Sequence, residues 1–307
     1  MRENFKVKMG NLTFRTPLLT GSGTFGYGDE FLPVMDYKPL GGIVSKSISP
    51  KPRIGNPPPR ICETVGGGLL NSIGLANPGV DKFIENIATH LPFGHTRIFL
   101  SIVGDSVEDF VYVTEKLEGV PNIDGYELNV SCPNVKKGGL ELGGDKDAVY
   151  SITKAVRSIT KRFISVKLTP NQTKITPTAE VAAKAGADAL TLVNTLIGMA
   201  IDVEKRTPLL GMVTGGYSGI PLKPVALAKV WQVSQAIDIP IWASGGIVRG
   251  TDAIEFLLAG ASGLQLGSVM FADPNAPTRI LNEMAAYCER HSIKEITELI
   301  GGLILPK

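Results

Sequence analysis

Cysteine and histidine are scarce in this sequence, and their scarcity excludes two kinds of site. The chain has three cysteines, Cys62, Cys132 and Cys288, which are widely spaced and form no CxxC pair. An odd number of isolated cysteines predicts neither a disulfide framework nor a structural zinc site. The three histidines are also too few and too scattered to predict a metal cluster.

The chain also lacks a charge excess and a long apolar run. Lys plus Arg is 31 and Asp plus Glu is 29, so the net charge is +2, and no basic stripe points to a nucleic acid. No stretch approaches the length of a membrane span, and residues 1–14 contain no apolar signal region. We therefore expect a cytoplasmic protein without a membrane partner.

Length and hydrophobicity, in contrast, allow a large core. The chain has 307 residues, and 43% of them are hydrophobic. Short runs rich in β-branched residues recur along it, a pattern typical of strands that are buried on both faces. These runs are residues 17–23, 41–49, 98–104, 126–131, 163–170, 189–195, 239–246 and 263–271.

Helical patterns separate most of these runs. They cover residues 106–119, 145–162, 176–187, 223–237 and 251–261. Eight strands that alternate with helices predict an α/β fold, a (β/α)8 TIM barrel in a single domain over residues 1–307. A doubly wound open sheet is the alternative. That fold normally has fewer strands and a GxGxxG motif that opens a helix, whereas no helical pattern follows GSGTFG at 21–26.

Two additions to the barrel are expected. Residues 5–16 alternate in polarity around Gly10 and Asn11, which predicts a hairpin at the bottom of the barrel. Residues 50–78 are interpreted as a long loop insertion after the second strand, stiffened by a run of three prolines.

Polar residues and glycines gather where the predicted strands end. Active sites of such barrels lie at the carboxyl ends of the strands. Those ends carry Ser22, Lys46, Ser47, Ser101, Asn129, Cys132, Lys167, Asn194, Thr195, Gly245, Gly246, Gly267 and Ser268.

Two lysines in this set have two interpretations each. Lys46 and Lys167 either lie at exposed strand tips or pair with an anion in the site, because an unpaired buried ammonium is very costly. Asn129 and Asn194 are, taken singly, also compatible with hydrogen-bonded amides of the core.

The position of one cysteine distinguishes it from the other two. A lone cysteine is more often core filler than catalyst. Cys132, however, follows a strand end directly and precedes Pro133 and a glycine-rich loop. Cys62 and Cys288 have no such setting and are interpreted as structural.

Glycines after the last two strands favour a phosphorylated ligand. ASGG (243–246) and QLGS (265–268) let backbone N–H groups approach a phosphate closely, and the loops after strands 7 and 8 are the usual phosphate site of this fold. Tight turns without a ligand are the alternative for each loop. A glycosidase needs a pair of carboxylates, and the strand ends carry no such pair, which argues against that class of enzyme.

Several motifs together resemble one enzyme family. NSIGLANPG (71–79), ELNVSCPNVKKGG (127–139), GGYSGIPLKPVAL (215–227), ASGGI (243–247) and QLGS (265–268) closely resemble class 1 dihydroorotate dehydrogenases, which are FMN-containing barrels of pyrimidine synthesis. The resemblance extends from about Leu12 to the C-terminal region.

The resemblance implies roles for individual residues. It implies that Cys132 is the catalytic base, as cysteine is in class 1. It implies that dihydroorotate binds to Lys46, Asn71, Ser72, Ile73, Gly74, Leu75, Asn129, Asn194 and Thr195. It implies that FMN contacts Ser22, Lys46, Ser47, Ser101, Asn129, Lys167, Val193, Gly219, Gly245, Gly246, Gly267 and Ser268.

The motifs SCPNVKKGG and GGYSGIPLKP are more similar to the B type of class 1, which uses NAD. This likeness implies a homodimer core that assembles with an FAD- and [2Fe-2S]-containing electron-transfer subunit into a heterotetramer. Three scattered cysteines cannot hold an iron–sulfur centre alone, because such a centre normally takes four. The alternatives are a fumarate-dependent A-type enzyme, an enzyme like dihydropyrimidine dehydrogenase, and, from another class, a Schiff-base aldolase.

Overall fold

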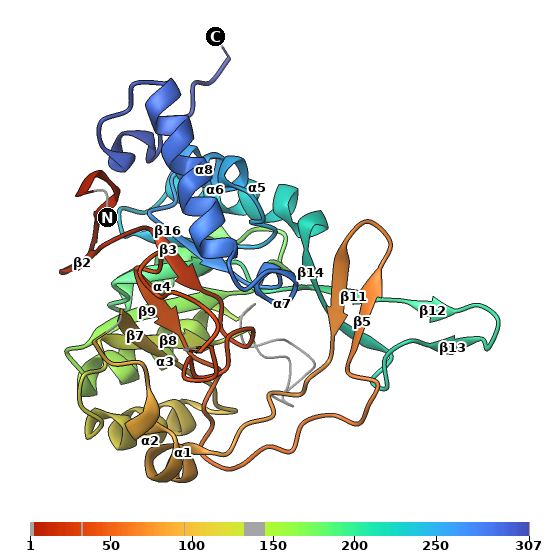
Figure 1. Cartoon of the computed structure of the whole chain (residues 1–307). Helices are drawn as coiled ribbons and strands as arrows, with labels where there is room; N and C mark the ends of the chain where they lie inside the picture. The colour runs from red at the N-terminus through yellow and green to blue at the C-terminus, as the bar shows by residue number, and fades with distance from the viewer. Residues whose placement is uncertain (1–2, 32, 95, 132–144, 307) are drawn as a thin grey trace.

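A closed parallel β-barrel forms the centre of the molecule (Figure 1). The computed structural model describes residues 3–31, 33–94, 96–131 and 145–306. The barrel has the strand order β10-β15-β16-β3-β4-β7-β8-β9, so the predicted (β/α)8 fold is confirmed. Its strands are β3 (Leu18–Thr20), β4 (Gly42–Val44), β7 (Arg97–Ile102), β8 (Gly125–Asn129), β9 (Phe163–Leu168), β10 (Ala189–Leu192), β15 (Ile241–Ser244) and β16 (Gly263–Leu266).

Each of the eight predicted runs overlaps one barrel strand, although every strand ends before its run does, and β7 and β8 begin one residue before their runs. Their residues are almost all buried, because helices cover the outside of the barrel and side chains fill its inside. The last run was expected to be a strand as far as residue 271. Its strand instead ends at Leu266, and residues Val269–Ala272 form the short helix α7.

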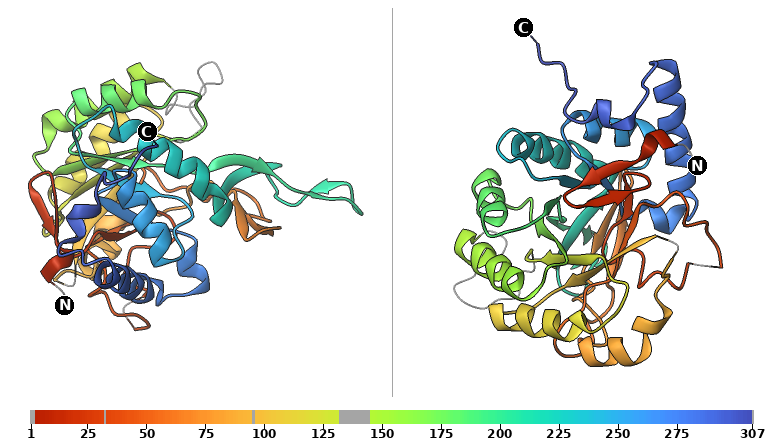
Figure 2. Two further views of the ribbon diagram at one scale, coloured as in Figure 1. Left: turned by 90° about the horizontal axis from the view of Figure 1, so that it is seen from above. Right: turned by 90° about the vertical axis from the view of Figure 1, so that its left-hand side faces the viewer.

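Helices surround the barrel in the expected alternation (Figure 2). The five predicted helices are confirmed, and Ser106 begins one of them by accepting a hydrogen bond from the backbone N–H of Asp109 at 3.2 Å. The helices are α1 (Val80–Asn86), α2 (Val107–Glu118), α3 (Lys146–Ile159), α4 (Thr176–Lys184), α5 (Lys223–Ser234), α6 (Gly250–Leu258), α7 (Val269–Ala272) and α8 (Ala276–Arg290). Short 3-10 turns are η1 (Glu3–Phe5), η2 (Ala88–His90), η4 (Ile220–Leu222) and η5 (Ile296–Leu299).

The predicted N-terminal hairpin closes the bottom of the barrel. Strands β1 (Val7–Met9) and β2 (Leu12–Phe14) pair antiparallel around Gly10 and Asn11. The ring of Phe14 stacks on Phe99 at 5.8 Å, and the indole of Trp242 lies against Phe99 and Phe163 at 4.9 and 5.4 Å. The sulfur of Met9 also contacts the Trp242 indole N–H. Aromatic side chains from the hairpin and three barrel strands therefore form a dry floor.

A second sheet lies beside the barrel, and it corrects the expectation that residues 50–78 are only loop. Within them β5 (Ile61–Thr64) and β6 (Gly68–Asn71) form a hairpin. This hairpin joins β14 (Thr214–Gly219) and β11 (Leu196–Met199) in a four-stranded antiparallel sheet of order β11-β14-β6-β5, here called the side sheet. No residue of β5 or β11 is buried, and in β14 only Gly219 is, so these strands lack the buried apolar runs by which the barrel strands were predicted.

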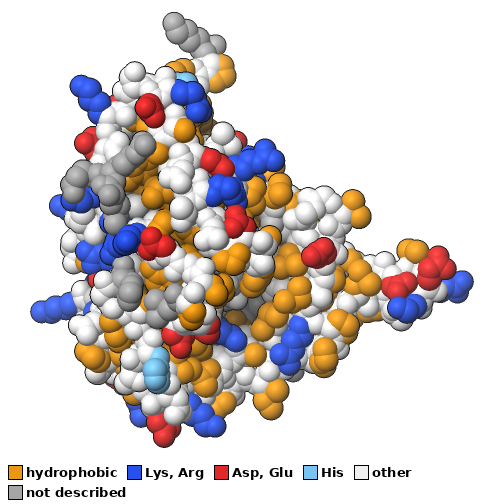
Figure 3. All heavy atoms as spheres, viewed as in Figure 1, with side chains coloured by type: hydrophobic (Ala, Val, Ile, Leu, Met, Phe, Trp, Pro, Cys, Tyr) orange, Lys and Arg blue, Asp and Glu red, His pale blue; other side chains and the backbone are white. Residues whose placement is uncertain are grey.

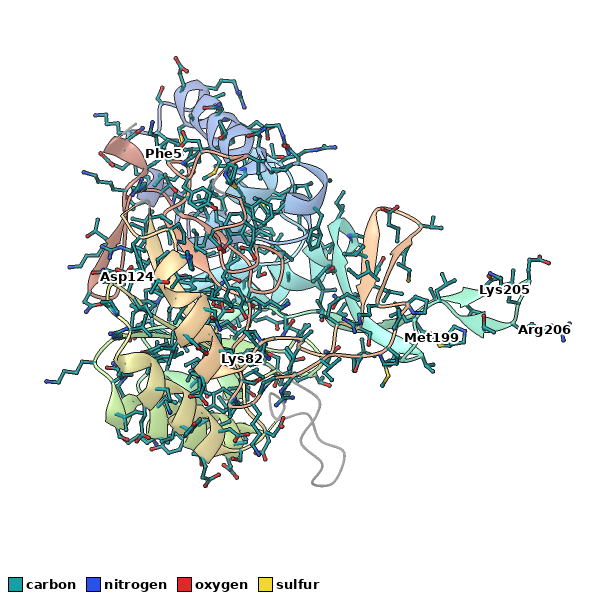
Figure 4. The ribbon with its side chains drawn as sticks, turned by 60° about the horizontal axis from the view of Figure 1, so that its bottom comes forward. Phe5, Lys82, Asp124, Met199, Lys205 and Arg206 are labelled. Carbon is teal, nitrogen blue, oxygen red and sulfur yellow. The ribbon has the colours of Figure 1, made fainter. Side chains whose placement is uncertain are left out.

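An arm continues the side sheet away from the barrel. Strands β12 (Ile201–Asp202) and β13 (Thr207–Pro208) pair antiparallel, and Lys205 and Arg206 lie at the tip (Figure 4). Apolar side chains gather over the side sheet on the face seen in Figure 3. On the side sheet and the arm, the exposed apolar residues include Ile61, Ile197, Met199, Ile201 and Val203, with exposed fractions from 48% to 75%.

None of the helices in the described ranges is long and apolar enough to cross a membrane.

The aromatic floor predicts a contrast between the two tryptophans of the chain. Trp242→Ala removes a fully buried indole and should lower the free energy of unfolding by about 3–5 kcal/mol. Trp231→Ala, on α5 with 37% of the residue exposed, should cost about 0.5 kcal/mol or less. Denaturant unfolding followed by far-UV circular dichroism measures both, and equal losses would contradict the floor's importance.

Candidate active site

Hydrogen-bonded polar side chains form a row across the carboxyl end of the barrel. The hydroxyl oxygens of Ser47 and Ser101 lie 2.9 Å apart, and Asn129 Nδ2 donates to Ser47 Oγ at 3.5 Å. Asn194 Nδ2 donates to Asn129 Oδ1 at 3.4 Å, and its own Oδ1 accepts from the backbone N–H of Thr195 at 2.9 Å. The row thus joins residues from the ends of β4, β7, β8 and β10, and the two asparagines partner each other there.

Lys167 lies almost completely inside the barrel mouth. It is 5% exposed, and its Nζ donates to Ser22 Oγ at 3.2 Å. The same Nζ lies 3.8 Å from Oε1 of Glu127, which is fully buried. An ammonium has three donors, and the described residues provide one hydrogen-bond acceptor for it. The interpretation of Lys167 as an exposed strand tip is therefore wrong.

Lys46 lies two residues after the end of β4 and is partly exposed. Its backbone N–H donates to the carbonyl of Gly26 at 2.7 Å, which fixes the chain at this point. Its ammonium makes no hydrogen bond or ion pair with any residue in the described ranges. A partly exposed cation beside the polar row is suited to bind an anionic group.

The loop of residues 71–75 begins where β6 ends, and the side sheet positions it. Asn71 pairs with Gly216 of β14, and its Nδ2 donates to the Gly216 carbonyl at 3.2 Å. Gly216 in turn lies against the Thr195 side chain, which a Cβ at Gly216 would meet at 2.2 Å. The side sheet therefore places Asn71 close to the polar row.

Hydrogen bonds to backbone hold the rest of this loop. Asn56 makes three hydrogen bonds to it: its backbone N–H donates to the carbonyl of Ile73 at 3.1 Å, and its Nδ2 donates to Ser72 Oγ at 2.9 Å and to the Ser72 carbonyl at 3.2 Å. Asn77 Nδ2 donates to the carbonyl of Leu75 at 2.8 Å. Gly74 has φ 72° and lies so close to Asn56 that a side chain would collide with it.

Three glycine-containing turns meet on the other side of the barrel mouth. Gly219 and Gly246 have φ of 92° and 76°, which a residue with a side chain rarely adopts. A Cβ at Gly246 would lie 2.7 Å from Cβ of Lys223 and 3.0 Å from the Gly219 carbonyl, so only glycine fits there. At Gly267 a Cβ would meet nothing within 4 Å, so open space lies over that turn.

The remaining predicted residues of this region also lie at the rim. Val193 donates its backbone N–H to the Ser244 carbonyl at 2.9 Å, which holds it next to Gly245. Ser268 follows Gly267 and precedes α7.

Lys223 at the start of α5 lies beside these turns. Burial lowers the pKa of Lys223, but hydrogen bonds to Asp252 at 2.7 Å and Glu255 at 2.9 Å outweigh burial and raise the pKa above its usual value. Lys223 therefore holds α5 to α6 as a paired cation.

Cys132, the predicted catalytic base, lies outside the described residues. The segment just before it is fixed, since Ser131 Oγ donates to the backbone carbonyl of Lys167 at 2.8 Å. The described segment therefore ends at a residue, Ser131, that is attached to β9.

A cavity of about 320 Å³ lies at the opposite end of the barrel, where the N-terminal ends of the strands meet the hairpin. None of the predicted site residues lines this cavity. The candidate site is therefore assigned to the polar row and the glycine turns at the barrel mouth. The residues around this cavity are Lys6, Thr13, Arg15, Gly41, Gly94, Thr96 and Arg97.

Two residues of the region were not selected from the sequence. Glu127 lies two residues before Asn129 on β8, so both point into the barrel. A carboxylate within a buried strand was the available signal. Asn77 accepts from the backbone N–H groups of Ser49 and Gly79 at 3.2 and 2.9 Å and so connects two loops at the site. Within the described ranges, no group of three His, Cys, Asp or Glu residues is arranged to hold a metal ion.

Comparisons with known proteins agree on one family. The family model described as dihydroorotate dehydrogenase matches residues 4–287. A protein of Geobacter metallireducens named dihydroorotate dehydrogenase B (NAD(+)), catalytic subunit, is 47% identical over 302 residues, which cover 98% of this chain and 99% of the relative. Proteins of the same name from Alkaliphilus metalliredigens and Bacteroides thetaiotaomicron are 47% and 44% identical, each over 98% of this chain and 99% of their own length. The chain belongs to the dihydroorotate dehydrogenase family.

Proposed function

We propose that this chain is the catalytic subunit of an NAD-dependent dihydroorotate dehydrogenase, which oxidises dihydroorotate to orotate in de novo pyrimidine synthesis in the cytoplasm. The observation that carries the proposal is the polar row Ser101–Ser47–Asn129–Asn194 between two lysines, at the mouth of a barrel of this family. We also propose that residues 1–307 form one FMN-binding barrel domain.

FMN suits the groups at the barrel mouth. The turn at Gly267 borders open space, and the turns at Gly219, Gly245 and Gly246 are packed so closely that glycine suits each of them, which supports a phosphate approached by backbone there. The ammonium of Lys167 has spare donors in a nearly dry position, which supports a ring edge with acceptor atoms. When bound, FMN accepts a hydride at its N5. The proposed FMN residues are Ser22, Lys46, Ser47, Ser101, Asn129, Lys167, Val193, Gly219, Gly245, Gly246, Gly267 and Ser268.

Dihydroorotate would bind above the polar row. Its carboxylate needs a cation, and Lys46 has an ammonium without a partner in the described ranges. Its ring amides need donors and acceptors in one plane, which Asn129, Asn194 and Thr195 offer at the row's end. The loop Asn71–Leu75 would complete the pocket, since the side sheet holds it against Thr195.

Cys132 would take the proton. The reaction removes a proton from C5 and a hydride from C6, and the proton requires a positioned base. Cysteine has a reference pKa near 8.5, so part of it is thiolate near neutral pH, whereas a serine hydroxyl needs far more help. Ser131, the residue before Cys132 in the chain, is attached to β9 by its hydrogen bond to the Lys167 carbonyl.

The electrons must leave through another protein if NAD is the final acceptor. The chain has three cysteines, one fewer than an iron–sulfur cluster normally uses. We propose a homodimer core that assembles with a subunit carrying FAD and a [2Fe-2S] cluster into a heterotetramer. The words "catalytic subunit" in the relatives' names and the exposed apolar residues of the side sheet and arm support such assembly.

The first experiment is an anaerobic visible spectrum of the purified chain. Dihydroorotate should bleach the yellow flavin, and neither fumarate nor NAD should restore the colour while the partner subunit is absent. Rapid recovery with fumarate would indicate an A-type enzyme instead. Bleaching by dihydrouracil but not by dihydroorotate would indicate a dihydropyrimidine dehydrogenase-like substrate. A colourless chain that borohydride traps with a keto substrate would indicate an aldolase.

Replacement of the proposed base should separate binding from turnover. Cys132→Ser should retain FMN and orotate binding but lose at least about 100-fold in turnover near neutral pH, the usual worth of a positioned base. Stopped-flow reduction of the flavin by dihydroorotate measures this rate. Cys62→Ser, at a half-buried position on β5, is the matched control and should keep the rate. Near-normal reduction by Cys132→Ser would refute the base assignment.

Replacement of the proposed carboxylate partner should act on affinity. Lys46→Ala should weaken orotate binding at least about tenfold, because one charge-assisted hydrogen bond is lost. Titration of the flavin spectrum with orotate gives the dissociation constant. Lys51→Ala, with an exposed side chain on the same segment, is the control and should have the affinity of the unmodified chain. An unchanged affinity in Lys46→Ala would exclude this role.

A further inference from the structure

The inside of the barrel holds a carboxylate that the proposed reaction does not use. Glu127 is fully buried on β8, above the aromatic floor and below the polar row. Its Oε2 accepts from Thr191 Oγ1 at 2.8 Å and from Gln265 Nε2 at 2.6 Å. Its Oε1 has no hydrogen-bond partner among the described residues and lies 3.8 Å from Nζ of Lys167.

The hydrogen bonds around Glu127 all point towards it. Thr191 has a single hydroxyl hydrogen, and it donates that hydrogen to Glu127. The 2.9 Å contact between Ser165 and Thr191 must therefore have Ser165 as its donor. Donors from β9, β10 and β16 thus converge, directly or in relay, on one oxygen. Such an arrangement is suited to hold a negative charge in a place without water.

Purely structural packing does not account for the other oxygen. A buried carboxylate is costly unless it is paired and hydrogen-bonded, and an apolar residue of similar size would often be as stable. The free oxygen of Glu127 faces the one cation in this part of the described barrel interior, Lys167. Lys167 in turn extends towards the mouth, where Ser22 accepts one of its hydrogens.

We propose that Glu127 is the positioning and charge-balancing residue of Lys167, and that through Lys167 it sets the reduction potential of the bound flavin. This inference rests on the proposed function. A flavin gains negative charge when it is reduced, and Lys167 would stabilise that charge. Glu127 keeps the ammonium at the height of the barrel mouth and offsets part of its positive charge. It therefore limits how strongly the site favours the reduced flavin and keeps the electrons available for a partner.

The test is the midpoint potential of FMN in Glu127→Gln, measured anaerobically against a reference dye. The amide introduced at position 127 has nearly the volume of the carboxylate. The Gln265 amide can turn, so that its oxygen accepts a hydrogen bond from the new amide. Loss of the negative charge should shift the two-electron equilibrium towards reduced FMN at least tenfold, which is about 30 mV. Thr191→Ser, which retains the hydroxyl, is the control for altered packing in the same layer. Its equilibrium between oxidised and reduced FMN should stay within twofold of that of the unmodified chain.

A second experiment tests whether the effect of Glu127 on the flavin passes through Lys167. In a Lys167→Met background, with FMN in excess, the cation through which Glu127 is proposed to act on the flavin is absent. Adding Glu127→Gln to that background should then change the equilibrium by less than twofold. A full tenfold shift in this background would show that Glu127 acts without Lys167 and would overturn the proposal.

The other outcomes are also decisive. An unmodified chain that binds no FMN would defeat the proposed function itself. A Glu127→Gln chain that holds FMN with a potential within twofold of the unmodified chain, or shifted towards the oxidised form, would overturn the inference alone. If that variant is not recovered folded, Glu127→Asp is used, which withdraws the carboxylate from Lys167 by one carbon. It should shift the equilibrium in the same direction at least threefold, and no shift would again overturn the proposal.

Discussion

The alternation of side chains along a closed parallel barrel is the constraint on which this structure depends. In each strand every second residue points inward, so register alone assigns each inward residue to a height. Phe163, Ser165 and Lys167 of β9 illustrate this: they contribute in turn to the aromatic floor, the buried polar layer and the barrel mouth. Hydrophobic burial at the bottom stabilises the barrel, and this stability allows costly charges to be placed higher up.

The barrel mouth is divided between two kinds of surface. On the β4, β7, β8 and β10 side, amide and hydroxyl side chains contact one another, so their orientation is fixed before a ligand arrives. On the β15 and β16 side, glycines leave backbone without side chains, as the open space over Gly267 illustrates. The first kind of surface suits a small planar molecule that must be oriented, and the second suits a phosphate group that must be approached closely.

Much of the fold could be predicted from the sequence, because the eight buried strands are compact apolar runs with helical patterns between them. The carboxyl ends of those strands also located most of the candidate site, since Ser47, Asn129 and Asn194 meet as expected. The side sheet was missed for a physical reason: β6 pairs with β14, and Gly68 lies opposite Gly219, far away in sequence. No local pattern records such pairing. The role of Glu127 could not be predicted, because the apolar neighbours of this residue dominate the strand pattern and its partners come from strands distant in sequence.

The pairing of β6 with β14 also determines where this chain can accept extra length. Side chains of a strand change face when its register slips by one residue. One residue added to or removed from the turn at 65–67 would shift β6 and turn Asn71 away from Thr195. The arm tip near Lys205 and Arg206, in contrast, is bounded by a two-residue strand on each side and lies far from the barrel mouth (Figure 4). Relatives that differ in length, and tags introduced by an experimenter, should therefore be accommodated at the arm tip and not in the β5–β6 turn.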